Sequence, residues 1–524
     1  MFQAPLRLLH DGLLHSLARV ADKSLAVVEG EPHSYAALGQ QSGQLAQALL
    51  ERGLQRGDRV AIYMDNTWPC IVSIFATLRA GGAFMVINPQ TKHDKLVFML
   101  EDSGAHILLS DTHLHPVLNP VIEQPPAQLH HMIVSGEHAL TSQVDAQLQL
   151  EAFAEVLASA GPFTERTTII ASDLAALIYT SGSTGNPKGV MHTHLSMVFA
   201  LNSIIQYLRL SEDDRILNVL PMAFDYGLYQ LLMSVWLGAT LVLERSFTYP
   251  AQVLKRIEEY QVTVFPGVPT IYSMLIAQYG RKPFALESIR RVTNTAAALP
   301  KSMLIPLRAI FPNALIFKMY GLTECKRTCY LEPELLDTHG DSVGKAIPGT
   351  EVFLLSPEGE RMPPGSEGIL HVRGPHLMLG YWKRPDQTAQ MLKAGELPNE
   401  RILCTHDWFR MDQDGFLYFV GRTDDIIKSR GEKVSPLEVE KVLLTIDGVD
   451  EAAVIGVDDD VLGQAVKAFV TLHAGCQLKE HELKKICMSR LENFMVPKFI
   501  DIIETMPKSP NGKIDKKWLK SPGI

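Results

Sequence analysis

A loop rich in glycine and hydroxyl side chains, closed by a lysine, offers the clearest chemistry in this sequence. It spans residues 179–189 and reads YTSGSTGNPKG. Glycines let the backbone turn sharply and present N–H groups to an anion, the hydroxyls add donors, and Lys188 adds a mobile positive charge. The loop therefore suits the polyphosphate of a nucleotide. Because Gly189 stands where the Walker pattern G-x-x-x-x-G-K-[ST] requires Ser or Thr, a P-loop kinase or GTPase is disfavoured.

Three further segments carry side chains that could act on the same ligand. The string YGLTE at 320–324 follows an apolar run at 314–318, and the end of a strand is where ligands usually bind in α/β sheets. Asp407 and Arg422 stand on either side of an Asp-Gly turn. Lys513 follows Asn-Gly, a tight-turn dipeptide that would hold the lysine at the tip of a loop. Each segment taken alone has a simpler explanation, a plain turn or a solvated charge.

Alternating strands and helices must position these segments. Apolar runs predict the strands, and amphipathic stretches predict helices between them, including one that stops at Gly53 and one that begins at about His194. This alternation implies parallel sheets covered by helices. The predicted strands are residues 60–64, 84–87, 174–179, 262–265, 289–293 and 314–318.

The pattern changes after about Arg410. A helix is predicted to open at Ser435 with a cap, a first-turn proline and a capping-box glutamate, Glu438. Around it we expect strands at 416–420, 452–457 and 466–472 and a lysine-rich helix near 480–491. These elements form a small α+β domain of about one hundred residues. We therefore expect two domains, residues 1–423 and residues 424–524.

The composition is that of an ordinary globular protein. The chain has 524 residues, of which 46% are hydrophobic and 20% charged, and its net charge is −9. This negative net charge gives no indication of the basic surface that nucleic-acid binding requires. Charges interrupt residues 1–24, so a signal-peptide core is lacking, and the apolar stretch at 231–243 is too short to span a bilayer. Six cysteines without a C-x-x-C pair favour free thiols. We expect a cytoplasmic protein that binds neither nucleic acid nor membrane.

Taken together and in this order, the four motifs between Thr180 and Asp515 resemble those of the adenylate-forming superfamily. Its members are acyl-CoA synthetases, luciferases and the adenylation domains of nonribosomal peptide synthetases. The resemblance implies an α/β fold like that of acyl-CoA synthetases. Such a fold has a large N-terminal domain of helix-covered, largely parallel sheets and a small mobile α+β C-terminal domain, with a hinge at Asp424. It also implies ATP as co-substrate together with Mg²⁺, and a monomer or dimer.

The resemblance assigns a role to individual residues. Tyr320 would lie against the adenine, Glu324 near Mg²⁺, and Asp407 on the ribose hydroxyls. Lys513 would bridge the substrate carboxylate and the α-phosphate. The side chains with a catalytic role would be Thr184, Lys188 and Lys513. The residues that bind ATP would be Thr180, Ser181, Gly182, Ser183, Thr184, Gly185, Lys188, Tyr320, Thr323, Asp407 and Arg422.

The string MAFDYGLY at 222–229 bears on which carboxylic acid is activated. Acyl-CoA synthetases commonly carry histidine where Phe224 stands, whereas amino-acid-activating domains resemble F-D, with the aspartate holding the α-ammonium of the substrate. Asp225 matches the second pattern, although an aspartate that caps a helix is the simpler alternative. Two tyrosines and a methionine favour a small substrate. The substrate-binding positions implied by the resemblance are Asp225, Tyr226, Tyr229, Pro266, Val292, Asn294 and Met319, followed by Arg327 and Thr328.

The strings NTAAALP at 294–300 and MYGLTECKR at 319–327 resemble stand-alone prolyl-AMP ligases. This implies that a small amino acid is activated as an aminoacyl-AMP, with L-proline as the best candidate. The acyl group would then pass to the 4′-phosphopantetheine thiol of an acyl or peptidyl carrier protein in natural-product (nonribosomal peptide) biosynthesis. One alternative is an AMP-forming acyl-CoA ligase that acts on a small carboxylic acid without an amino group. Another, of a different class, is a non-catalytic nucleotide-binding protein.

Overall fold

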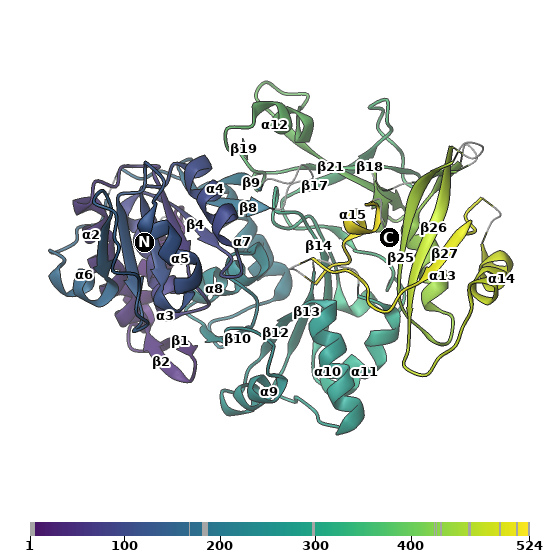
Figure 1. Cartoon of the computed structure of the whole chain (residues 1–524), viewed down its shortest axis with the longest axis horizontal. Helices are drawn as coiled ribbons and strands as arrows, with labels where there is room; N and C mark the ends of the chain where they lie inside the picture. The colour runs from purple at the N-terminus through teal and green to yellow at the C-terminus, as the bar shows by residue number, and fades with distance from the viewer. Residues whose placement is uncertain are drawn as a thin grey trace. The chain divides into compact units, whose positions relative to one another are not determined.

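The structure is a computed structural model of the chain. It describes residues 6–166, 168–180, 187–295, 299–423, 425, 427–429, 432–459, 463–491, 494–509 and 512–521. Figure 1 shows the helices and strands of the chain. Backbone contacts group the chain into two compact units. Unit 1 contains residues 1–340, 346–351 and 373–403, and unit 2 contains residues 341–345, 352–372 and 404–524. The predicted boundary and hinge at Asp424 fall on a residue outside the described part and stay predictions.

One sheet of unit 1 carries the glycine-rich loop. Its strands β3, β4, β5, β6, β7 and β8 pair in parallel, whereas β9 pairs antiparallel with β8 and β19 antiparallel with β9. The strand order is β19 (Gly380–Tyr381), β9 (Lys188–Thr193), β8 (Leu174–Thr180), β4 (Ala83–Ile87), β3 (Arg59–Tyr63), β5 (Ile107–Asp111), β6 (His131–Ser135) and β7 (Gln149–Ala152).

A second sheet carries the YGLTE motif. Its central strands are parallel, and antiparallel strands lie toward both edges. The order is β16 (Lys345–Ala346), β15 (Cys329–Leu331), β14 (Leu315–Tyr320), β13 (Arg291–Asn294), β12 (Val264–Gly267), β10 (Arg215–Asn218), β11 (Thr240–Leu243), β1 (Ser24–Val28) and β2 (Glu31–Ser34). The predicted strands are confirmed in both sheets, and their ends shift by no more than two residues.

Helices connect and cover these sheets. In Figure 1, α10 and α11 lie side by side next to β12 and β13. The helices of unit 1 are α1 (Asp11–Val20), α2 (Tyr35–Glu51), α3 (Trp68–Ala80), α4 (His93–Ser103), α5 (His115–Glu123), α6 (Phe153–Ser159), α7 (His194–Leu208), α8 (Asp225–Leu237), α9 (Pro250–Glu259), α10 (Pro269–Arg281), α11 (Leu304–Ile310) and α12 (Pro385–Met391). None of the helices in the described ranges combines the length and the apolar character that a membrane crossing requires.

Local signals explain where these helices begin and end. Ser34 caps α2 by accepting a hydrogen bond from the backbone N–H of Ala37, and Thr193 caps α7 in the same way. The chain leaves α2 through Gly53, whose φ of +85° is left-handed and favours glycine, as the sequence predicts. The α/β architecture of alternating helices and largely parallel strands is therefore confirmed.

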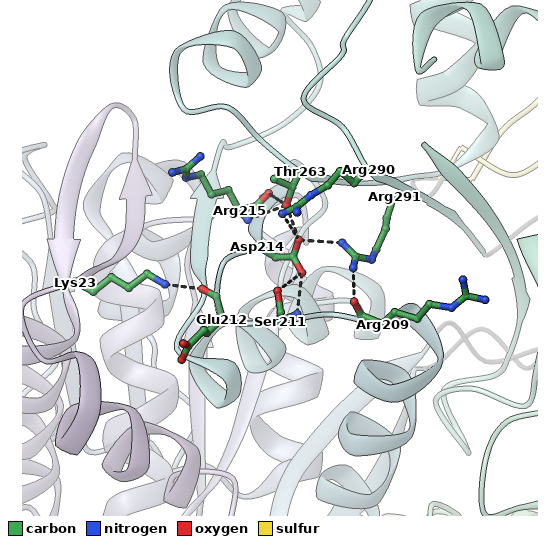
Figure 2. Close-up of polar contacts among 9 residues, drawn as sticks. All are labelled: Lys23, Arg209, Ser211, Glu212, Asp214, Arg215, Thr263, Arg290 and Arg291. Carbon is green, nitrogen blue, oxygen red and sulfur yellow. Dashed lines mark hydrogen bonds and ion pairs between the residues drawn. The ribbon is translucent and has the colours of Figure 1, made fainter. Parts of the chain in front are cut away.

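A buried carboxylate, Asp214, holds the amino ends of three parallel strands of the second sheet (Figure 2). Its side chain is fully buried and accepts hydrogen bonds from Thr263, just before β12, at 2.8 Å and from the backbone N–H of Ser211 at 2.8 Å. The guanidinium groups of Arg290 and Arg291, at the start of β13, lie 3.2 and 3.0 Å from the same oxygen. Asp214 itself directly precedes β10. One side chain thus fixes the starting points of β10, β12 and β13.

Two further sheets have strands mainly from the second half of the chain. The third has the order β17 (Glu351–Leu355), β18 (Glu367–Arg373), β21 (Arg401–Met411) and β20 (Leu392–Ala394), with β22 (Leu417–Arg422) paired to β21. The fourth has the order β24 (Glu432–Val434), β23 (Ile427–Ser429), β26 (Gly463–Leu472) and β25 (Val449–Asp459), with β27 (Phe499–Ile502) paired to β26.

Unit 2 has its own apolar core, formed where α13 (Pro436–Leu444) and α14 (Glu480–Arg490) pack on the fourth sheet. A short helix, α15 (Lys516–Leu519), follows near the end of the chain. The predicted strands and both predicted helices of this region are confirmed, and Ser435 occupies the predicted cap position with Pro436 in the first turn. The Ser435 hydroxyl makes no capping hydrogen bond and donates instead to the carbonyl oxygen of Val420.

Candidate active site

The two ends of the predicted phosphate loop lie side by side. Thr180, at the end of β8, pairs with Lys188, at the start of β9, so the loop is the connection of an antiparallel hairpin. Ser181, Gly182, Ser183, Thr184 and Gly185 lie outside the described residues, and their roles stay predictions. Asp102 fixes the approach to the loop, because it accepts hydrogen bonds from the Tyr179 hydroxyl at 2.7 Å and from Arg384 at 2.9 Å.

Tyr381 connects the lysine of this loop with the YGLTE motif. The ammonium of Lys188 lies 5.4 Å from the centre of the Tyr381 ring, within the range of a cation–π contact. The hydroxyl of Tyr381 donates to Glu324 at 2.5 Å. Backbone pairing of β19 with β9 sets the position of Tyr381. Lys188 and Glu324 thus contact the same tyrosine, one through its ring and the other through its hydroxyl.

A second link comes from His192 on β9. Its Nε2–H donates to the carbonyl oxygen of Thr323 at 2.8 Å. Burial lowers the pKa of His192 well below its ordinary value, and the nearby Lys326 lowers it further, so the ring stays neutral. Gly321 is required at the turn between β14 and Thr323, because a Cβ there would lie 2.4 Å from the carbonyl oxygen of Lys326. These contacts therefore fix the backbone conformation of the YGLTE motif and its position next to β9.

Asp225, predicted to hold the ammonium of an amino acid, already has a cation. The Lys326 ammonium lies 2.5 Å from its carboxylate, and the two side chains are 1% and 13% exposed. Asp225 is the first residue of α8 and Phe224 occupies the cap position, so the capping alternative is wrong. Burial lowers the pKa of Lys326, and Asp225 opposes this shift by favouring the charged form. The pair is a buried ion pair inside unit 1.

The other predicted substrate-binding residues lie on α8 and on three strands of the second sheet. Tyr226 and Tyr229 follow on the first turns of α8, and the Tyr226 hydroxyl donates to the carbonyl oxygen of Thr293 at 2.6 Å. The Lys326 ammonium lies 5.7 Å from the centre of the Tyr229 ring. The remaining predicted positions are on the neighbouring strands β12, β13 and β14, and all are buried: Pro266, Val292, Asn294 and Met319.

Unit 2 brings together three of the predicted ATP-binding and catalytic residues. Asp407 on β21 and Arg422 on β22 are directly paired in the sheet, and their side chains lie 3.4 Å apart. Lys513 lies on the predicted tight turn, where the backbone N–H of Ser509 donates to its carbonyl oxygen at 2.7 Å. Desolvation lowers the pKa of Lys513, the positive charge of Arg422 lowers it further, and Asp407 raises it. The three side chains therefore act on each other electrostatically.

No group of three or more histidine, cysteine, aspartate or glutamate side chains within the described ranges is arranged to hold a metal ion. Glu324, the predicted magnesium ligand, is one carboxylate held by Tyr381. Mg²⁺ is commonly bound by one or two carboxylates together with phosphates of the substrate, so this donor set fits a magnesium–nucleotide complex.

Sequence reasoning missed the roles of Lys326, Tyr381 and His192. Lys326 stands inside the string MYGLTECKR and Tyr381 inside Gly380-Tyr381-Trp382, but neither string identifies a partner. The contacts join residues 101 and 57 positions apart. His192 could have been recognised as buried only from the alternation of buried and exposed side chains along the strand that follows the loop.

Comparisons with known proteins agree with this geometry. The family model described as AMP-binding enzyme matches residues 13–382, and that of the AMP-binding enzyme C-terminal domain matches residues 438–513. A long-chain-fatty-acid–CoA ligase of Bacillus subtilis is 29% identical over 98% of this chain and 94% of its own length. Bacitracin synthase 3 of Bacillus licheniformis is 30% identical over 96% of this chain, which covers only 8% of that protein.

Among solved structures, the o-succinylbenzoate coenzyme A synthetase of Bacillus subtilis in complex with ATP and magnesium ion is similar over 97% of this chain and 99% of its own. The TM-score is 0.82 and the sequence identity 27%. The expected large N-terminal and small C-terminal parts of such a fold are confirmed, whereas a resemblance to prolyl-AMP ligases in particular has no support in these comparisons. The chain therefore belongs to the family of AMP-binding enzymes, the adenylate-forming superfamily.

Proposed function

We propose that this protein is an AMP-forming acyl-CoA ligase that activates a carboxylic acid without an α-amino group. The observation that carries this proposal is the buried pair of Asp225 and Lys326. Activation of proline rests on Asp225 being free to receive the ammonium of the substrate. In this chain, the ammonium that Asp225 needs is supplied by the protein.

The energetics of the pair favour an acid without an amino group. A buried carboxylate needs one cation, and Lys326 meets that need at 2.5 Å. An amino-acid ammonium at the same carboxylate would put a second cation beside a buried lysine, whose pKa is already lowered by desolvation. Displacing Lys326 instead would leave its ammonium buried without a partner, and breaking a buried pair costs about 3–5 kcal/mol.

The relatives support coenzyme A as the acceptor. Two of the three similar proteins described above are named as CoA ligases or synthetases. The second of them, the o-succinylbenzoate coenzyme A synthetase, was solved in complex with ATP and magnesium ion. The similarity to bacitracin synthase 3 keeps a carrier protein as the competing acceptor. Coenzyme A and a carrier protein both present the thiol of a phosphopantetheine group. An experiment must therefore decide between these two acceptors.

In the first step, a carboxylate oxygen attacks the α-phosphorus of ATP, the bond to pyrophosphate breaks, and an acyl-adenylate forms. Two anions must meet, so the site must supply positive charge and donors aimed at the transition state. We propose that Lys188 and the backbone of its loop bind the phosphates, and that Lys513 bridges the carboxylate and the α-phosphate. Magnesium, when bound by Glu324 and triphosphate oxygens, supplies further positive charge for the leaving pyrophosphate.

In the second step, a thiolate sulfur attacks the acyl carbon and AMP leaves, which gives the thioester. Tyr381 positions Glu324 through its hydrogen bond, and His192 holds the backbone of Thr323. Alignment of both reactants can lower the barrier by about 7–11 kcal/mol in favourable cases. Tyr381 and His192 thus fix the position of the protein groups proposed to bind magnesium and phosphate.

The test measures pyrophosphate release and product masses with the full chain, ATP, Mg²⁺ and a panel of acids. The panel contains straight-chain acids, aromatic acids and amino acids including L-proline, each offered with coenzyme A. We expect acid-dependent AMP formation and an acyl-CoA product with non-amino acids, and no turnover with proline. Pyrophosphate exchange with proline and with no other class of acid would contradict the proposal.

A matched pair of variants tests whether the protein is catalytic at all. Lys513→Ala removes the ammonium proposed to bridge the reactants and is expected to lower adenylation about 10²–10³-fold, the loss typical of one group that stabilises transition-state charge. Lys485→Ala, on the exposed side of α14, is the control and should retain full activity. Equal rates for the two variants would favour a non-catalytic nucleotide-binding protein.

A further inference from the structure

Two cationic side chains, Lys326 and Arg327, are buried next to each other after the YGLTE motif. Lys326 has Asp225 as its counter-ion. Arg327 is 6% exposed, and none of its contacts in the described ranges is with a carboxylate. Its Nη1 donates to the carbonyl oxygen of Lys326 at 3.1 Å and lies 3.4 Å from the Thr295 hydroxyl. Its Nε has no hydrogen-bond partner among the described residues.

A count of charges shows why this is unusual. Asp225 carries one negative charge, and Lys326 and Arg327 carry two positive charges. The neighbouring histidines add none, because burial lowers the pKa of His376 to about 4 and that of His192 well below its ordinary value. Glu324, the next carboxylate along the chain, acts on Lys326 electrostatically, is bonded to Tyr381 and is proposed for magnesium. Within the described ranges, Arg327 is therefore the cation of this cluster that has no carboxylate contact, and an unpaired buried charge is unfavourable.

The cluster lies where the acid is expected to bind. Thr295, beside Arg327, directly follows β13, and Tyr226, whose ring centre is 5.2 Å from the guanidinium carbon, is in the first turn of α8. Ligands of open α/β sheets bind at the carboxyl ends of the strands. The amino end of α8 adds a partial positive charge at the same place. All these residues belong to unit 1.

We propose that the acid activated by this protein carries a second carboxylate, remote from the reacting one, and that Arg327 binds it. This inference rests on the proposed acyl-CoA ligase function and names the substrate class, a dicarboxylic acid. Arg327 fits this role because a guanidinium binds a carboxylate through two parallel hydrogen bonds, and its Nε is one of the donors left unused. The rings of Tyr226 and Tyr229 lie 5.2 Å from Arg327 and 5.7 Å from Lys326, and they are the apolar groups proposed for the carbons between the two carboxylates. A simple fatty acid would leave the guanidinium buried without a counter-ion.

The experiment compares matched acids with the full chain, ATP and Mg²⁺, with acyl-adenylate trapped by hydroxylamine. The pairs are butyrate and succinate, hexanoate and adipate, octanoate and suberate, and benzoate and terephthalate, with monomethyl suberate as an uncharged analogue. We expect kcat/KM for at least one diacid to exceed that of its matched monoacid about tenfold or more, with the difference mainly in KM. Removing a contact made equally in the ground and transition states changes KM and leaves kcat.

Variants of Arg327 assign the preference to its side chain. Arg327→Gln is expected to lower kcat/KM for the diacid about 10- to 100-fold, the range of a hydrogen bond to a charged group, and to leave the monoacid within about threefold. Arg327→Lys keeps the charge and should retain part of the preference. Arg308→Gln, an exposed arginine on α11 that pairs with Asp337, is the control and should behave like the wild type.

The outcomes separate this inference from the function on which it rests. Monoacids that match their diacids at every length, or a diacid preference that Arg327→Gln leaves unchanged, would overturn the inference while the ligase activity stands. A wild-type protein that adenylates none of the acids overturns the proposed function, and the inference with it. The comparison of acids on the wild type decides the matter even if Arg327→Gln fails to fold.

Discussion

Replacing Lys326 by methionine removes the ammonium that faces Asp225 and keeps most of the volume of the side chain. The carboxylate of Asp225, 13% exposed, is then left without its cation. The single substitution Asp225→Asn leaves Lys326, 1% exposed, without its anion. The double substitution removes both charges together. This set of three variants therefore measures how strongly the two side chains depend on each other.

Breaking a buried pair from one side costs about 3–5 kcal/mol, whereas replacing both charges by neutral groups is often close to neutral. Because Asp225 keeps some contact with solvent, we expect about 3 kcal/mol for either single substitution and about 1 kcal/mol for the double. A loss of 3 kcal/mol raises the exchange rate of amide hydrogens that open with this region by about two orders of magnitude.

Hydrogen exchange followed by mass spectrometry suits this protein, because two compact units need not unfold in one transition. Peptides from α8 and β14 report on the pair, and peptides from α14 in unit 2 serve as the internal reference. The expected result is fast exchange in α8 and β14 for each single variant, near-normal exchange for the double variant and no change in α14. Single variants within about threefold of wild type, or effects that simply add in the double variant, would refute the reasoning and leave Asp225 available for a substrate ammonium.

Three further outcomes follow from the same contacts. Tyr381→Phe removes the hydrogen bond to Glu324 and should raise the Mg²⁺ concentration needed for half-maximal pyrophosphate release; an unchanged requirement would argue against a role of Glu324 in binding magnesium. Gly321→Ala places a methyl group 2.4 Å from a carbonyl oxygen and should cost about 1–3 kcal/mol and most of the activity, and an active, equally stable variant would contradict this. His376, fully buried, has its pKa lowered to about 4 from 6.5, so the unfolded chain binds its proton first as the pH falls. Between pH 6.5 and 5 the wild type should lose about 1.5 kcal/mol of stability from this residue, and urea titrations of His376→Gln should show that much less pH dependence; equal slopes would exclude it.

Much of the fold follows from short stretches of sequence. Apolar runs of four to six residues predict strands such as β8 and β14 because a buried parallel strand needs little more than length and apolar side chains. The glycine-rich loop and the YGLTE string follow their strands directly, so their places at strand ends are also predictable. Ser435 occupies the cap position as predicted, but its hydroxyl donates to the carbonyl oxygen of Val420, 15 residues earlier, on a strand that the sequence does not place beside it.

The partners inside the candidate site could not be predicted in the same way. F-D in the sequence identifies Asp225 as a buried acid, but its counter-ion comes from a residue 101 positions later. Such an aspartate either binds a cation of the substrate or already has a counter-ion in the protein. Which of the two applies depends on which side chain of the turn after Glu324 points toward Asp225. Lys326 has a left-handed φ of +63° there, which no local signal predicts for a lysine. The choice between an amino acid and another acid therefore depends on a tertiary contact.

Asp214 lies at the opposite end of its sheet from the residues proposed to handle the acid, and yet it ties together the first residues of three strands that lead there. Any slippage at that end displaces the far ends by the same amount, because a strand is stiff along its length. Inherited or selected changes at Asp214 would consequently present as weak, temperature-sensitive activity with normal reactant requirements. Misaligned strands should be tested as the cause of such a defect before Asp214 is given a role in the chemistry.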